Sequence, residues 1–144
     1  SFIGIDTRHR LPHFSRAVLE GITFSLKDAQ MIMEEVADRR FEKIISVGGG
    51  AKNQEWLQMQ ADIFNAEILT LSTEQGPGMG AAMLAAIGSG LFQDVASCVA
   101  AFVSFDQTIQ PIPENVAQYQ KVYPIYQKVY AQTANLCHAL QEID

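Results

Sequence analysis

The sequence predicts an α/β domain in which a largely parallel sheet is flanked by helices. Three apolar, strand-like runs, at residues 2–5, 44–47 and 67–71, alternate with segments whose apolar residues recur every three or four positions. The connections between these runs are long enough to hold helices, and crossovers of that kind join parallel strands. Of the 144 residues, 48% are hydrophobic and 18% are charged, so the chain can bury a core of its own.

The first run, at residues 2–5, has no turn before it and no initiator methionine. We therefore expect a fragment that is entered partway through a domain. A polar loop follows, and a helix should begin at Pro12 or His13, because proline is favoured in the first helical turn. Apolar residues at helical spacing continue to Ala37 and predict one long amphipathic helix.

The run at 44–47 ends in Gly48, Gly49 and Gly50 and passes into a helical pattern over residues 53–65. Glycine carries no Cβ and adopts positive φ, so backbone N–H groups of such a turn can converge on a phosphate beside the helix N-terminus. Asn53 can cap this helix or offer its amide to a ligand. From these residues alone, a turn that only packs against its neighbours is favoured over an anion site.

The rest of the chain predicts helices separated by loops. We expect a strand at 67–71, a loop at 72–80, a small-residue helix at 81–87, a short helix at 94–103, an extended linker at 110–113 and a final helix from Glu114. In that helix, Tyr119, Tyr123, Tyr126 and Tyr130 follow at steps of four, three and four, which is typical of a packing face. Pro124 predicts a kink or a break.

The net charge narrows the class of partner, and the two cysteines indicate the cellular compartment. The formal net charge of −6 argues against nucleic acid or an anionic membrane, since both require clustered Lys and Arg. Cys98 and Cys137 have no CxxC spacing, so we expect buried thiols in a reducing compartment, the cytoplasm. Neither a secretion signal nor a membrane span is recognisable in the printed residues.

Isolated side chains favour ordinary structural roles. His9 and His13 lie four positions apart with no third ligand nearby in sequence, so no metal site is predicted. Lys52 could approach a phosphate as a point charge, but it lacks the Walker spacing, and most exposed lysines are simply solvated.

Four landmarks in a fixed order resemble the C-terminal domain of the FGGY carbohydrate kinases. They are the run at 2–5 followed after seven residues by His-Phe-Ser-Arg-Ala-Val-Leu-Glu-Gly at 13–21, Gly-Gly-Gly-Ala-Lys-Asn at 48–53, the glycine- and alanine-rich segment 76–86, and the tyrosine-rich helix 119–130. Within the family, the triple glycine and the Tyr-Pro-x-Tyr sequence look most similar to xylulose kinases. Gluconate, ribulose and glycerol kinases share much of the pattern.

The resemblance implies a ribonuclease-H-like domain of the actin and hexokinase type, present in part and extended by C-terminal helices. In such kinases two domains close on a sugar and ATP, and the general base is an Asp of the N-terminal domain. Residues 1–144 would then be the nucleotide-binding half, without the sugar-binding domain and without a catalytic residue. Mg²⁺ would be held mainly by ATP and the missing domain, and we expect this fragment alone to be inactive.

The resemblance also implies the site residues. Gly48, Gly49 and Gly50 would lie against the phosphates and ribose of ATP or ADP, and Asn53 would contact the nucleoside. The alternative is a non-catalytic or regulatory binding module on the same fold. By analogy, a hairpin that would pair with the strands is missing, so we expect exposed strand edges and self-association into a homo-oligomer.

Overall fold

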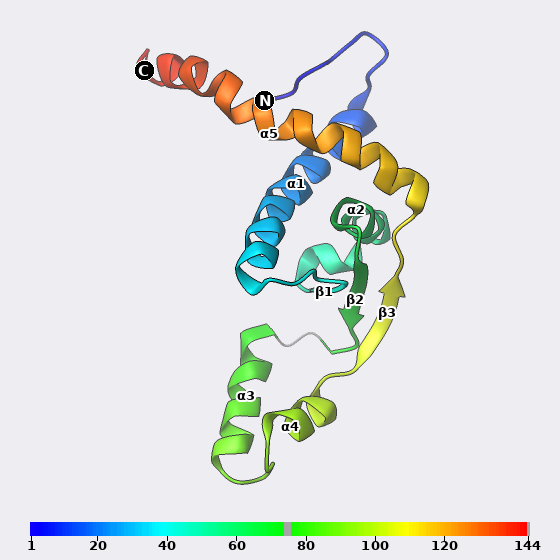
Figure 1. Ribbon diagram of the computed structural model, residues 1–144, viewed down its shortest axis with the longest axis vertical. Helices are drawn as coiled ribbons and strands as arrows, with labels where there is room; N and C mark the ends of the chain where they lie inside the picture. Colours follow the sequence, from blue (N-terminus) through cyan, green and yellow to red (C-terminus); the bar gives the residue numbers. More distant parts are fainter. Residues whose placement is uncertain (74–75, 144) are drawn as a thin grey trace. The chain divides into compact units, whose positions relative to one another are not determined.

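A computed structural model describes residues 1–73 and 76–143 (Figure 1). The chain divides into two compact units, one made of Ser1–Arg40, Asp62–Phe64 and Ile112–Asp144, the other of Phe41–Ala61 and Asn65–Pro111. In the described residues, no helix combines the length and the apolar character needed to cross a membrane.

The first unit is built around two long helices, α1 (Leu11–Ala37) and α5 (Pro113–Gln141). Figure 1 shows α5 crossing over α1. The buried ring of Phe24 on α1 lies 5.9, 5.7 and 5.1 Å, centroid to centroid, from the rings of Tyr119, Tyr123 and Tyr126. The predicted packing face is confirmed for these three tyrosines.

Two residues of α5, Tyr130 and Pro124, differ from what the sequence predicted. Tyr130 is 75% exposed and so lies outside the core. The break expected at Pro124 does not occur, because α5 runs as one helix through that residue. Ring contacts to Phe24 from Tyr119 and Tyr123 before the proline, and from Tyr126 after it, hold both halves of the helix against α1.

Polar contacts fix the pairing of α1 with α5. Arg16 Nη2 donates to the Tyr119 hydroxyl over 2.8 Å, and that hydroxyl donates to Glu20 Oε1 over 2.8 Å. Tyr123 donates to Asp28 in the same way. Burial raises the pKa of Tyr119 to about 12, and its hydrogen bond to Glu20 acts in the same direction.

Residues 2–5 do not form the predicted strand. Gly4 has a φ of +78°, which interrupts an extended backbone, and no strand pairs with this segment among the described residues. Instead, the ring of Phe2 lies edge-on to Phe14 of α1 with centroids 5.2 Å apart. Helix α1 begins at Leu11, so Pro12 occupies its first turn as expected.

The second unit holds a three-stranded sheet in the order β1 (Lys43–Ser46), β2 (Glu67–Leu71) and β3 (Phe105–Ile109) (Figure 1). Strands β1 and β2 are parallel, as predicted, whereas β2 and β3 are antiparallel. The sheet is therefore mixed. Strand β3 was not predicted, because three polar residues stand at its centre and it exposes nearly all of its side chains.

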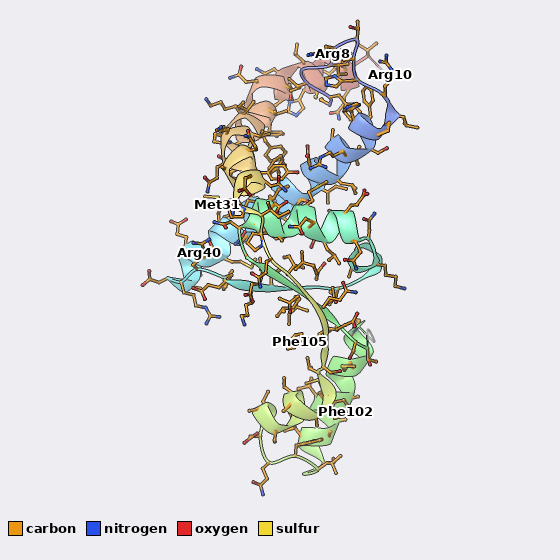
Figure 2. All side chains as sticks on the ribbon, turned by 90° about the vertical axis from the view of Figure 1, so that its right-hand side faces the viewer. Arg8, Arg10, Met31, Arg40, Phe102 and Phe105 are labelled. Carbon is orange, nitrogen blue, oxygen red and sulfur yellow. The ribbon has the colours of Figure 1, made fainter. Side chains whose placement is uncertain are left out.

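Helices α2 (Gln54–Phe64), α3 (Gly76–Gly88) and α4 (Val95–Phe102) complete the fold. Helix α3 begins five residues earlier than residue 81, because Pro77 fits the first helical turn. Of the loop expected at 72–80, residues 74 and 75 lie outside the described residues. Figure 2 shows Phe102 at the end of α4 and Phe105 at the start of β3, where the chain enters the sheet.

Candidate functional site

The glycine turn connects β1 to α2 through a single 3₁₀ turn, η1 (Gly49–Lys52). The N–H of Ala51 donates to the carbonyl of Gly48 over 3.0 Å, and the N–H of Asn53 donates to the carbonyl of Gly50 over 3.1 Å. The sequence predicted a tight turn and a helix start here, and both are confirmed, with η1 inserted between them.

The three glycines differ in whether the structure itself requires them. Gly48 has a φ of +90°, a backbone conformation that residues with a side chain rarely adopt. A Cβ on Gly50 would lie 2.5 Å from Cζ3 of Trp56, so this glycine lets the indole ring pack onto the turn. Gly49 has neither a positive φ nor an atom within 4 Å of the position its Cβ would take. The chain's own conformation and packing therefore do not explain a glycine at position 49.

Asn53 caps helix α2. Its Oδ1 accepts a hydrogen bond from the N–H of Trp56 over 3.0 Å, and its backbone carbonyl accepts from Leu57 over 2.9 Å. Since the cap uses the oxygen of the amide, the nitrogen of the same group keeps its two donors for a ligand. Asn65, in the left-handed conformation at a φ of 51°, ends the helix as the sequence predicted.

A pocket of about 330 Å³ lies beside this turn. Parallel strands β1 and β2 bring their carboxyl ends to one edge of the sheet, and antiparallel β3 brings its amino end to the same edge. The polar residues that line the pocket come from all these elements: Ser46, Lys52, Gln54, Thr70, Ser72, Asp106 and Gln107. Ligands of α/β proteins commonly bind at such an edge.

The predicted site residues are neighbours in sequence of residues that line this pocket, but they do not line it themselves. Ala51 and Lys52 of the turn line the pocket. The lining does not include Gly48, Gly49, Gly50 or Asn53. Thr70, Asp106 and Gln107 were not found from the sequence, because the position of β3 beside β2 depends on tertiary pairing. The run Phe-Asp-Gln-Thr-Ile at 105–109 was the one local signal for that strand.

Hydrogen bonds fix the walls of the pocket. Gln54 Nε2 donates to Gln107 Oε1 over 2.7 Å, and the N–H of Gln107 donates to Thr70 Oγ1 over 3.2 Å. Ser46 Oγ donates to Gln60 Oε1 over 3.0 Å. The polar groups are thus held in place before any ligand arrives, which lowers the entropic cost of binding.

A larger cavity, of about 840 Å³, lies in the other unit between the first residues and α1. Its lining is mostly apolar but includes His9 and His13, whose Nδ1 atoms accept hydrogen bonds from the backbone N–H groups of Asp6 and Arg10. The smaller pocket is the better candidate site, because the glycine turn and the amino end of α2 lie beside it.

The arrangement is suited to binding an anion. The hydroxyl and amide groups of the pocket lining can serve as its hydrogen-bond partners. Backbone donors, the positive end of the α2 dipole and the ammonium group of Lys52 attract phosphate. Within residues 1–73 and 76–143, no three His, Cys, Asp or Glu side chains gather into a metal site.

Comparison with known proteins gives consistent matches. The model of the C-terminal domain of the FGGY family of carbohydrate kinases matches residues 1–89. The chain is 51% identical to the xylulose kinase of Lactococcus lactis, over 100% of the chain and 29% of that protein. It is 28% identical to the gluconokinase of Bacillus licheniformis, over 97% of the chain and 28% of that protein.

A solved structure matches as well. The ligand-bound xylulose kinase of Lactobacillus acidophilus superposes with a TM-score of 0.82 at 33% identity, over 93% of the chain and 27% of that structure. The chain thus spans less than a third of the length of the proteins that it resembles.

Proposed function

Since this chain belongs to the FGGY family of carbohydrate kinases, we propose that it forms the nucleotide-binding, C-terminal part of an ATP-dependent sugar kinase. The observation that carries this proposal is Gly49, a glycine in the turn beside the pocket that the chain's own packing does not require. A phosphate drawn against that turn does require it, because a side chain there would take the place of the ligand.

The residues of this chain bind and orient ATP or ADP. Backbone N–H groups of Gly48, Gly49 and Gly50, aided by the α2 dipole, hold the phosphates near the ribose, and the amide nitrogen of Asn53 contacts the nucleoside. Mg²⁺ bound to the phosphates would neutralise charge during transfer. The sugar and its general base belong to the remainder of the full-length protein.

Xylulose is the sugar that the comparisons favour. The xylulose kinase relative is 51% identical to this chain, against 28% for the gluconokinase. Gluconate is the second candidate, since its kinase aligns with nearly the whole chain. We place the protein in the cytoplasm, because Cys98 and Cys137 are both free thiols. Cys98 is buried as expected, whereas Cys137 is exposed and not buried.

The test is a sugar panel on the purified full-length protein. With ATP and MgCl₂ present, release of ADP is measured with xylulose, gluconate and glycerol, and without any sugar as the control. We expect turnover with xylulose and much slower turnover with the others. ADP release that no sugar stimulates would contradict the kinase proposal, and faster turnover with gluconate would reassign the substrate.

A further inference from the structure

The pocket beside the glycine turn carries one side chain of each charge among its described lining residues, Lys52 and Asp106. We propose that Lys52 binds the phosphate chain of the nucleotide and that Asp106 opposes it, so that the pocket discriminates ligands by their charge. This inference rests on the proposed function and deepens it.

Lys52 lies next to the amino end of α2 and to the amides of the glycine turn. It is the last residue of η1 and stands one position before the cap of α2, so its ammonium group adds to the helix dipole and the turn amides. Lys43 on β1 forms an ion pair with Glu67 at 3.5 Å, whereas Lys52 forms none with the other described residues. Because the chain has a net charge of −6, most of its field repels anions. The positive charge of Lys52 should therefore contribute strongly to anion binding at this pocket.

Asp106 enters the same pocket from β3. Its carboxylate repels phosphate and so weakens the hold on the most highly charged ligands. The Gln54–Gln107 hydrogen bond of 2.7 Å joins residues that lie next to the two charged positions, two after Lys52 and one after Asp106. That bond links the two segments that carry the charges.

The experiment compares ATP, ADP, AMP and adenosine, measured by calorimetry on the full-length protein. The variants are Lys52→Met, Asp106→Asn and the control Lys43→Met, which removes a lysine that lies outside the pocket lining. Lys52→Met should weaken ATP binding about 10- to 100-fold, the usual loss for a charged hydrogen bond. Asp106→Asn should tighten ATP binding about two- to fivefold. Both effects should shrink from ATP to AMP and vanish for adenosine.

The possible outcomes separate this inference from the function beneath it. If the wild-type protein binds none of the four ligands, the proposed function fails and this inference fails with it. If the wild type binds ATP and Lys52→Met binds it equally well, only the assignment of Lys52 is overturned. An equal loss of ATP and adenosine affinity would also overturn it, because it would indicate a structural role.

Discussion

Gly50 lies against the indole ring of Trp56, whose Cζ3 would be 2.5 Å from a Cβ at that position. Gly50→Ala should therefore lower the free energy of unfolding by about 1–3 kcal/mol, the usual cost of overpacking. Gly49→Ala meets no neighbour and is the matched control, with an expected change within about 0.5 kcal/mol. Urea unfolding followed by Trp56 fluorescence measures both. Equal stability of the two variants would show that the indole ring moves away at little cost.

Ionisation of the Tyr119 hydroxyl should make the free energy of unfolding depend on pH in the alkaline range. Burial raises the pKa of this hydroxyl from 10.0 to about 12, so the folded state keeps a proton that the unfolded state loses. The resulting stabilisation is complete below pH 10.0 and is lost as the pH rises towards about 12. Between these values wild type should lose stability more steeply than Tyr119→Phe, as measured by urea unfolding at several pH values. Parallel pH curves would contradict this.

Residue roles that depend on neighbours in sequence were predictable. The caps at Asn53 and Asn65 and the turn at Gly48 follow from local backbone chemistry. Lys52 and Asp106 could not be assigned to one pocket in this way, because β3 reaches the sheet edge only through its pairing with β2. Local patterns carry no information about which residues distant in sequence will meet.

Elements with strong periodicity were predicted, and weakly patterned elements were missed. Helices α1 and α2 and strands β1 and β2 lie within two residues of their expected ends. The run at 2–5 has the composition of a strand, but a strand needs a hydrogen-bonded neighbour, and the described chain offers it none. Strand β3 is the reverse case: its composition is not typical of a strand, because it contains several polar residues. It forms a strand because it pairs with β2.

Asp62 anchors the start of α5. This carboxylate is 3% exposed and accepts hydrogen bonds from the N–H of Ile112 over 2.8 Å and from Asn115 Nδ2 over 2.7 Å. Asp62→Ala would leave both donors without that acceptor and should cost about 1–3 kcal/mol of unfolding free energy. Asp62→Asn retains one acceptor oxygen and should lose less. Urea unfolding of both variants tests this, and an Ala variant as stable as wild type would contradict it.

At the scale of the whole molecule, the described sheet ends in two outer strands, β1 and β3. In the order β1-β2-β3, the outer strands each have one neighbour among the described strands, and Ile45 and Val47 are 47% and 59% exposed on and just after β1. Unpaired apolar edges promote association. We expect the 144-residue chain to form oligomers whose size grows with concentration in light scattering. The Ile45→Lys variant should reduce this growth. A monomer at every concentration would mean that the edges are satisfied within the chain.

The central claim is that the glycine turn binds the nucleotide, and Gly49→Val tests it most directly. This position has room for a side chain in the protein itself, so the variant should fold normally. A valine there would occupy the space next to the turn amides, where we place the phosphates. Calorimetry on the full-length protein should show ATP binding weakened far more than sugar binding. ATP affinity equal to that of the wild type would contradict the account.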